Sequence, residues 1–422
     1  MKSLPEYMMV EKLTRKMFDY QVLCLGLAAV IFVIYTGNIV FEIPLKSLTC
    51  SDRSILYVTQ EGTEARFRTN LNAEKLHSVQ EESGRVDDEK SLPVAPVNLT
   101  EDERITWLQK QMPKFEIFKS NNYTRQFHRR VLEFFSVDCE AKFFMTWISP
   151  AGTFGPREFL AMESLFKAHP HGCLMILSRS MDSGRGYRIL QPLRERGFKV
   201  TAVSPDLASL FKDTPAKAWL DRIKSGKKDP GEIPLAQNLS NLMRLAVLYK
   251  YGGVYLDTDF ITLKPFTELR NTIGAQSMET GSKKWTRLNN AVLVFDVNHP
   301  LLLRFMEEFA STFDGNKWGH NGPYMVTRVV ERVGNEPGYN FTVLPSMAFY
   351  PVNWHKIHGF FQKPKTQIDS RWVEAVLLRL KREAYGVHLW NKQTSRLKIE
   401  EGSIMGRLVS KHCVICKQIY RY

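Results

Sequence analysis

Short apolar runs of strand length alternate with segments of helical spacing along most of this 422-residue chain. Such alternation favours an α/β protein with a mostly parallel sheet, because each parallel strand needs a crossover segment that returns the chain to the same edge. The strand-like runs are 142–149, 173–177, 198–203, 254–256, 291–295 and 387–390, and the helical segments are 159–166, 239–247, 300–309 and 373–380.

Residues 22–41 form an uncharged and largely apolar run of about 20 residues, the length that crosses a bilayer as a helix. Because positive charge stays on the cytosolic side, the run predicts a cytosolic tail at 1–21, a signal-anchor at 22–41 and a lumenal remainder. A cleaved signal peptide is the alternative, but Ile39, Val40 and Phe41 end the run where small residues would be needed at a cleavage site. The basic residues before the run are Lys2, Lys12, Arg15 and Lys16, against Lys46 and Arg53 after it.

Hydrophobic periodicity is thin from residue 42 to residue 135. Glu, Arg, Ser, Asn and Lys dominate 60–92, and Pro93 and Pro96 follow. This composition predicts a mobile lumenal stem at 42–135, with at most a short helix at 105–112, ahead of one α/β domain at 136–422.

Cysteines and glycosylation triplets agree with an oxidising lumen. Four cysteines in the body of the chain allow three connectivities, of which we prefer Cys139–Cys173 with Cys413–Cys416, and a zinc site at the last two stays open. Asn98, Asn122 and Asn340 begin Asn-x-Ser/Thr triplets, as does Asn238 in a helical segment.

The formal net charge is +14, from 58 Lys and Arg against 44 Asp and Glu. Such a balance fits nucleic acid, an anionic membrane surface or a phosphorylated small substrate. The chain lacks a zinc-finger pattern and a glycine-aromatic RNA motif, and its basic residues are spread rather than clustered. We therefore predict no nucleic-acid partner and interpret the excess charge as a solvated surface.

Two carboxylates, Asp257 and Asp259, directly follow the apolar segment 254–256. Alternate residues of an extended chain point the same way, so both side chains can face one hard cation. An Asp-x-Asp tripeptide alone is also what a surface turn contains. Its setting is more specific, because a helical segment ends at Gly252-Gly253 and a buried strand then leads to the pair, at the sheet edge where α/β proteins bind ligands.

The long segment 238–259 closely resembles the signature of the Asp-x-Asp sugar-transferase family, glycosyltransferase family 32. Three later segments and the closing Cys-Val-Ile-Cys resemble its α-1,4-glycosyltransferase, lactosylceramide 4-α-galactosyltransferase-like branch, and plant members in particular. The likeness covers about residues 139–422 and implies a single GT-A (Rossmann-like) domain. The later segments are Asn289-Asn-Ala-Val-Leu-Val-Phe-Asp296, His320-Asn-Gly-Pro323 and Val387-His-Leu-Trp-Asn-Lys392.

The resemblance implies that Asp257 and Asp259 hold Mn²⁺ or Mg²⁺ and approach the diphosphate of a sugar nucleotide. Arg244 would contact the donor or orient the Asp pair, and Asn241 stands where relatives often carry Asp, which leaves its donor role in doubt. Further donor-side candidates are Trp147 in the early strand loop, Tyr255, and the pair Asn289 and Asn290, which alternatively form a turn before a strand.

A late histidine completes the metal site in related transferases, which implies that role for His388, with Lys392 near a phosphate oxygen. A histidine in an apolar run is otherwise a core residue. The segment His320, Asn321, Gly322 and Pro323 resembles the acceptor-side loop, although Gly322-Pro323 also suits a helix start.

The resemblance further implies retention of anomeric configuration, with the departing phosphate taking the acceptor proton. The sequence offers no carboxylate pair of the kind that retaining hydrolases use, and Asp296 is the one extra carboxylate that we single out for catalysis.

We therefore expect a Golgi, single-pass type II glycosyltransferase that moves a hexose or N-acetylhexosamine from a UDP-sugar to a glycan or glycolipid and forms an α-1,4 linkage. Alternatives are a GDP-mannose-dependent mannosyltransferase of the same fold and a non-catalytic lumenal protein that kept the fold.

Overall fold

The structure, a computed structural model, describes residues 94–136, 138–334 and 336–416. The predicted cytosolic tail and signal-anchor, and the predicted stem up to residue 93, lie outside these ranges. Among the described helices, none combines the length and the hydropathy that a bilayer crossing requires.

Backbone contacts divide the chain into two compact units. The larger contains Lys75–Pro364 and Val376–Tyr422, and the smaller contains Met1–Glu74 and Lys365–Ala375. Both sheets and the site described below belong to the larger unit.

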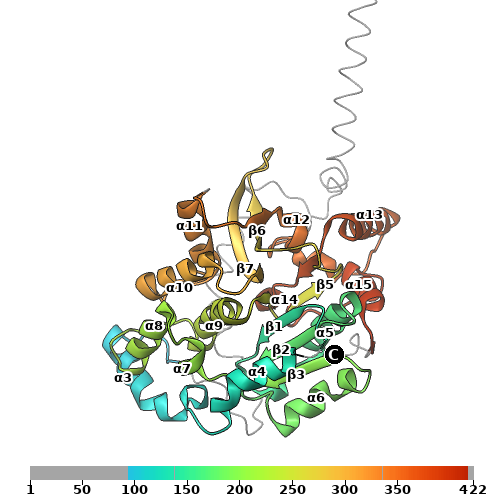
Figure 1. Ribbon diagram of the computed structural model, residues 1–422. Coiled ribbons are helices and arrows are strands. Elements are labelled where there is room, and N and C mark those ends of the chain that lie inside the picture. The colour runs from blue at the N-terminus through green and yellow to red at the C-terminus, as the bar shows by residue number, and fades with distance from the viewer. Residues whose placement is uncertain (1–93, 137, 335, 417–422) are drawn as a thin grey trace, which may run out of the picture. The chain divides into compact units, whose positions relative to one another are not determined.

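The α/β class expected from the sequence is confirmed by the order of the elements (Figure 1). The strands are β1 (Lys142–Thr146), β2 (Cys173–Leu177), β3 (Lys199–Val203), β4 (Gly253–Leu256), β5 (Phe260–Thr262), β6 (Thr272–Met278), β7 (Trp285–Phe295), β8 (Thr342–Leu344) and β9 (Gly386–His388). The α-helices are α3 (Glu101–Gln111), α4 (Phe127–Phe135), α5 (Pro156–Ala168), α6 (Gly184–Arg194), α7 (Leu207–Leu210), α8 (Pro215–Lys224), α9 (Leu235–Tyr251), α10 (Pro300–Thr312), α11 (Pro323–Val333), α12 (Ser346–Phe349), α13 (Gln367–Glu383), α14 (Asn391–Thr394) and α15 (Ile404–His412).

The main sheet has seven strands in the order β3-β2-β1-β4-β7-β6-β8. The pairs β1–β2, β2–β3, β1–β4 and β6–β8 are parallel, whereas β4–β7 and β6–β7 are antiparallel. The sheet is therefore mostly parallel, and within it β7 runs in the direction opposite to the other strands. We call β3-β2-β1-β4 the parallel half of this sheet and β7-β6-β8 its mixed half. A second sheet pairs β5 with β9.

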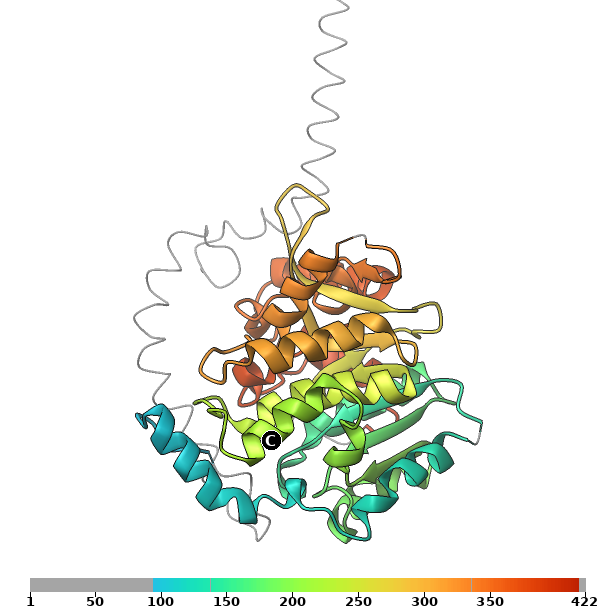
Figure 2. The ribbon, with the colours of Figure 1, turned by 60° about the vertical axis from the view of Figure 1, so that its left-hand side comes forward.

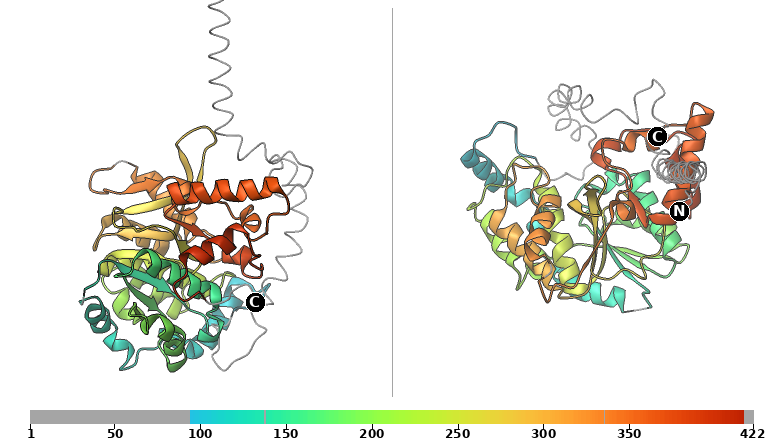
Figure 3. Two further views of the ribbon diagram at one scale, coloured as in Figure 1. Left: turned by 90° about the vertical axis from the view of Figure 1, so that its right-hand side faces the viewer. Right: turned by 90° about the horizontal axis from the view of Figure 1, so that it is seen from above.

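Helices cover both faces of the main sheet (Figure 3). The chain moves outward from β1 to β3 through α5 and α6, and then returns through α9 to β4 beside β1. Because parallel crossovers are right-handed, this reversal puts α9 on the face opposite α5 and α6. The reversal lies between β1 and β4, where open α/β sheets bind ligands beyond the carboxyl ends of their strands.

The segment before β1 belongs to the folded core. Leu108, Phe115 and Phe127 are at most 1% exposed and pack in the same hydrophobic cluster as α9. On α3, which lies beside α8 (Figure 2), Arg104 forms a bidentate ion pair with Asp229, with N–O distances of 3.0 and 2.6 Å.

The prediction of a stem as far as residue 135 is therefore wrong for 101–135. Aromatic side chains of this segment bury much surface each, and α4 carries Phe127, Val131 and Phe134 at helical spacing. The stem was predicted too long because the polar composition of 60–92 does not continue into these residues.

Two disulfides lie in the described residues, Cys139–Cys173 and Cys413–Cys416, the connectivity that we preferred from the sequence. The second one closes a turn whose backbone N–H groups at Val414 and Cys416 donate to the buried carboxylate of Glu163, at 3.1 and 2.8 Å. The turn thereby ties the end of the described chain to α5. The alternative of a zinc site at Cys413 and Cys416 is wrong, because the two sulfurs are bonded to each other.

Phe115→Ala tests whether the segment before β1 is part of the folded unit. Loss of a fully buried aromatic ring should destabilise the protein by about 3–5 kcal/mol. The matched control is Leu132→Ala in α4, where the side chain is 52% exposed and the expected change is within about 0.5 kcal/mol. Urea unfolding of the full chain measures both, and equal midpoints for Phe115→Ala and the unmodified protein would contradict the packing described here.

Candidate metal and nucleotide site

Strand β4 delivers Asp257 to the carboxyl edge of the sheet. Helix α9 ends at Gly252, whose positive φ of 61° turns the chain, and Gly253 follows with a φ of 115°. A Cβ atom on Gly253 would lie 2.5 Å from the carbonyl oxygen of Lys142, so the close packing of β4 on β1 requires glycine there. The backbone N–H of Asp257 then donates to Ala291 on β7 at 2.9 Å, which fixes the side chain just past the strand.

Pairing between β5 and β9 brings His388 to the two aspartates. Phe260, which directly follows Asp259, is the register partner of His388. The N–H of Leu389 donates to the carbonyl oxygen of Asp259 at 2.9 Å and continues the pairing. The pairing of β5 with β9 thus brings His388, which is distant in the sequence, to the two aspartates that follow β4.

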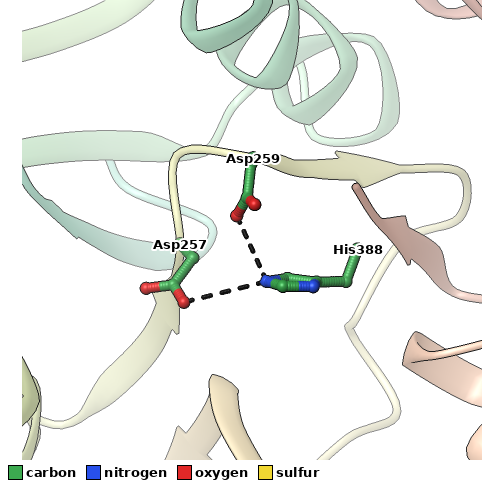
Figure 4. A group of neighbouring side chains, drawn as sticks. All are labelled: Asp257, Asp259 and His388. Carbon is green, nitrogen blue, oxygen red and sulfur yellow. Dashed lines mark ion pairs between the residues drawn. The ribbon is translucent and has the colours of Figure 1, made fainter. Parts of the chain in front are cut away.

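The imidazole of His388 points toward the carboxylates of Asp257 and Asp259 (Figure 4). His388 Nε2 lies 3.2 Å from Asp259 Oδ1 and 3.9 Å from Asp257 Oδ2. One donor atom from each residue lies within 4.8 Å of the others. The side chain of Asp257 is 27% exposed, while those of Asp259 and His388 are 11% and 9% exposed, so the cluster opens toward solvent at Asp257.

Each aspartate has one oxygen engaged by the protein. Asp257 Oδ1 receives the hydroxyl of Tyr255 at 2.9 Å and lies 3.1 Å from the guanidinium of Arg244. Asp259 Oδ2 accepts the backbone N–H of Asn391 at 2.8 Å. The opposite oxygens, Asp257 Oδ2 and Asp259 Oδ1, are those that face His388.

Charge at the cluster is balanced by two cations. Burial alone would lower the pKa of His388, but the carboxylates of Asp259 and Asp257 outweigh it and raise that pKa to about 9. Burial would raise the pKa of Asp259, but His388 and the amide of Asn391 outweigh it and hold the pKa below its usual value. Likewise, burial opposes the charge on Arg244, whereas Asp257 raises the pKa of that guanidinium.

The donor set fits a divalent cation that accepts oxygen and imidazole ligands. Two carboxylate oxygens and one imidazole nitrogen face a common point, and the second oxygen of each carboxylate is held by the protein. Such a mixed oxygen and nitrogen site suits Mn²⁺, whereas metals that prefer thiolates would be bound poorly. His388 presents Nε2 to that point, while its buried Nδ1 has no hydrogen-bond partner among the described residues. Three protein ligands leave coordination positions for phosphate oxygens and water.

Arg244 orients Asp257 in this structure. Its side chain is 3% exposed and also donates to the carbonyl oxygen of Asn290 at 2.8 Å and to Ser240 Oγ at 3.1 Å. Its guanidinium carbon lies 4.4 Å from the ring centre of Tyr255. Of the two roles left open by the sequence, the geometry provides the orienting one directly.

Asn289 and Asn290 lie inside β7, not in a turn before it, because the strand begins at Trp285. Asn290 Nδ2 donates to Asn241 Oδ1 on α9 at 3.0 Å, and Asn289 Nδ2 donates to Gln276 on β6 at 2.9 Å. Both side chains are buried. Asn241 and Asn290 therefore form one amide pair immediately beside Arg244.

The segment 320–323 ends a loop between α10 and α11. Asn321 is 3% exposed and donates to Asn238 Oδ1 and to the carbonyl oxygen of Asp314, at 2.9 and 2.8 Å. A Cβ atom on Gly322 would lie 3.1 Å from Asn241 Oδ1, which places the loop next to the amide pair. Pro323 begins α11, and the ring of His320 contacts the carbonyl oxygen of Thr312 at 2.9 Å, away from the metal ligands.

Trp147 and Lys392 are the remaining two donor-side candidates from the sequence. Trp147 follows β1, and its indole N–H donates to the carbonyl oxygen of Pro150 at 3.1 Å while its ring packs against Phe154. Lys392 lies on α14, with its ammonium 3.3 Å from the ring centre of Trp318.

Asp296 does not join the cluster. Antiparallel pairing of β7 with β4 sets Phe295 opposite Gly253, whereas Val292 is opposite Leu256, so Asp296 lies at the amino end of β4. Its carboxylate accepts from Arg270 at 2.7 Å and Asn271 at 3.0 Å. The catalytic role predicted for Asp296 is wrong, because the direction of β7 takes the residue to the far end of the sheet.

Sequence reasoning assigned no role to two residues near the site, Glu158 and Asn391. Glu158 is a mostly buried carboxylate whose Oε2 accepts the N–H of Gly155 and whose Oε1 accepts Asn391 Nδ2, at 2.9 and 3.2 Å. Burial, reinforced by the charge of Asp259, raises the pKa of Glu158. The Gly-Pro-x-Glu spacing signals a helix start, but nothing local links it to Asn391.

Comparison with known proteins gives two family matches. Residues 155–279 match the family described as glycosyltransferase sugar-binding region containing DXD motif. Residues 294–420 match the family described as alpha 1,4-glycosyltransferase conserved region. Asp257 and Asp259 lie in the first match, and His388 lies in the second.

Three curated relatives show how far the similarity extends along the chain. An uncharacterized Arabidopsis thaliana protein is 32% identical over 67% of this chain, which spans 43% of that protein. Mouse lactosylceramide 4-alpha-galactosyltransferase is 31% identical over 60% of this chain and 68% of the enzyme. Human alpha-1,4-N-acetylglucosaminyltransferase is 27% identical over 49% of this chain and 58% of the enzyme.

Among solved structures, the PaToxG glycosyltransferase is 16% identical, covering 76% of this chain and 97% of its own, with a TM-score of 0.32. The Streptococcus pneumoniae glycosyltransferase GlyE is 12% identical over 65% of this chain and 60% of its own, with a TM-score of 0.35. Neither score is high enough to support an assignment.

Arg244→Met tests the orienting role in the absence of any ligand. Removal of the buried partner of Asp257 should destabilise the protein by about 3 kcal/mol, because it breaks a buried ion pair and leaves polar groups unpaired. The matched control is Arg270→Met, whose ion pair with Asp296 joins side chains that are 80% and 44% exposed and should contribute at most about 1 kcal/mol. If Arg244 served only a bound donor, both ligand-free variants would unfold at nearly the same urea concentration.

Proposed function

Because the chain belongs to the DXD-containing, α-1,4-glycosyltransferase family, we propose that it is a retaining, divalent-metal-dependent glycosyltransferase of the GT-A group. It moves a hexose or N-acetylhexosamine from a UDP-sugar to a glycan or glycolipid acceptor. The observation that carries the proposal is the convergence of Asp257, Asp259 and His388, each with a donor atom facing one point.

In this proposal, Asp257 Oδ2, Asp259 Oδ1 and His388 Nε2 hold Mn²⁺ or Mg²⁺. When bound, the cation neutralises the charge that develops on the diphosphate as the sugar departs. Arg244 and Tyr255 keep the Asp257 carboxylate in place, and the amide of Asn391 does the same for Asp259. The chain thus supplies a site that needs little rearrangement when the nucleotide arrives.

In this proposal the donor lies toward the parallel half of the sheet, with the base near the Trp147 loop and the diphosphate at the two carboxylates. Asn289 and Asn290 stay candidates for contact with the transferred sugar, through the amide pair beside Arg244. Both oxygens of Glu158, the nearby buried carboxylate, accept hydrogen bonds from the protein. We therefore assign no dedicated base, and catalysis rests on positioning and electrostatic stabilisation.

The names of two relatives share a linkage and differ in the sugar. Both specify 4-α or α-1,4 transfer, which supports an α-1,4 product here. One transfers galactose and the other N-acetylglucosamine, and cells carry both sugars as UDP derivatives. A GDP-mannose donor is the alternative within the same fold, and linkage analysis after a donor-by-acceptor array decides between them.

We also propose a single-pass type II protein of the Golgi membrane with a lumenal catalytic unit. The apolar run at 22–41 and its preceding basic residues support this topology. The two disulfides support an oxidising compartment.

A thermal shift with Mn²⁺ and nucleotides tests the metal-nucleotide site. UDP with Mn²⁺ at about 100 times its dissociation constant should add about 2.7 kcal/mol of stability, and EDTA should remove the effect. Asp259→Ala should abolish the shift, while Asp296→Ala, the matched control from the far end of the sheet, should retain it. Absence of stabilisation by every metal-nucleotide pair would favour a non-catalytic protein, and a larger shift with GDP would favour the mannosyltransferase.

Glycosylation of the expressed protein tests the lumenal topology. Asn98, Asn122 and Asn340 are exposed, whereas Asn238 is 3% exposed within α9. Endoglycosidase treatment of the secretory-pathway product should lower its mass, and Asn→Gln at each exposed position should remove one glycan. Asn238→Gln is the control that should leave the number of glycans unchanged, and a product without any glycan would count against the lumenal location.

A further inference from the structure

The loop between α10 and α11 presents an exposed tryptophan beside the candidate site. Trp318 is 49% exposed, although tryptophan is usually mostly buried. The ammonium of Lys392 lies 3.3 Å from its ring centre. Lys392 directly follows Asn391, whose backbone N–H holds Asp259, so the ring is near the metal ligands.

A second exposed ring, Tyr324, follows this loop in the first turn of α11. Tyr324 is 40% exposed, and the guanidinium carbon of Arg287 is 4.5 Å from its ring centre. A Cβ atom on Gly319 would lie 2.9 Å from Tyr324 Cε2, so this ring packs on the backbone that follows Trp318. The two rings, each accompanied by a cation, form what we call the aromatic platform: Trp318, Tyr324, Lys392 and Arg287.

The loop that carries Trp318 is held at both ends. Asn316 Oδ1 accepts the N–H of Glu232 at 3.1 Å, and Asn316 Nδ2 donates to Asp229 at 3.3 Å. On the other side of the tryptophan, Asn321 is bonded to Asn238 on α9. A large apolar ring on a firmly supported loop tip is a feature of binding surfaces rather than of disordered loops.

The two rings of the platform lie on the mixed half of the sheet, in α11 and in the loop that leads into it. Helix α11, which begins one residue before Tyr324, contacts β7 through a hydrogen bond from the N–H of Leu288 to Thr327 Oγ1. A nucleotide occupies the carboxyl ends of the parallel strands, across the metal ligands from this half. An acceptor that approaches the donor sugar from the side opposite the nucleotide would therefore contact the platform.

We propose that the aromatic platform binds a pyranose unit of the acceptor glycan, and this inference rests on the proposed function. The C–H face of a pyranose stacks on an indole ring, and its hydroxyl groups accept hydrogen bonds from ammonium and guanidinium donors. Trp318 supplies the apolar contact, and Lys392 and Arg287 supply the donors. A mostly apolar surface with a few placed polar groups is the general character of small-ligand sites.

Binding of neutral oligosaccharides by the full chain tests the platform. The protein loaded with Mn²⁺ and UDP is applied to an array of neutral oligosaccharides, and the affinity for each captured glycan is measured for variants. Trp318→Ala should weaken glycan binding by about ten-fold or more, as loss of a central aromatic contact does. Trp318→Phe, which keeps a ring, should retain most of the affinity, and the Mn²⁺–UDP affinity of both variants should stay within about two-fold.

The matched control is Tyr187→Ala on α6. Tyr187 is 52% exposed and has the guanidinium carbon of Arg194 at 4.7 Å from its ring centre, but it belongs to the parallel half of the fold. It should leave glycan binding unchanged. The inference is overturned if the loaded protein captures no glycan, if Trp318→Ala binds glycans as tightly as the unmodified protein, or if it loses nucleotide affinity in parallel. Failure of the unmodified protein to bind any metal-nucleotide pair would instead overturn the proposed function.

Discussion

The pairing of β5 with β9 is the constraint on which the candidate site depends. Phe260 is opposite His388, so the backbone that leaves Asp259 is locked to the strand that carries the histidine. Two carboxylates this close repel one another, and their proximity is tolerated because Arg244 and His388 bring positive charge to either side. A divalent cation placed between the carboxylates would satisfy the same demand for positive charge.

Much of this arrangement was predictable from local sequence. The run at 173–177 matches β2, and the helical spacing before Gly252 predicts α9 with its end at the correct turn. The Asp pair follows a buried strand as expected. These predictions hold because hydrophobic periodicity, glycine conformation and strand length are determined by residues that are close together in the sequence.

Features that depend on strand direction or on distant partners were not predictable. Asp296 follows an apolar run just as Asp257 does, yet β7 is antiparallel to β4, and the two carboxylates therefore end at opposite edges. His388 was expected to alternate with Trp390 along a strand, but β9 ends at His388 and Trp390 adopts a left-handed conformation with φ of 56°. Neither the partner of a strand nor the end of its pairing is encoded within the strand itself.

The segment before β1 shows how such distant partners extend the site. Arg104 on α3 holds both oxygens of Asp229, and Asp229 in turn accepts Asn316 in the loop that presents Trp318. An ion pair in which Arg104 and Asp229 are less than 10% exposed is rigid, because neither charge can leave its partner without desolvation cost. A region whose composition suggests a spacer therefore supports the loop that carries Trp318. The folded unit that contains the site includes α3 and does not begin at the first strand.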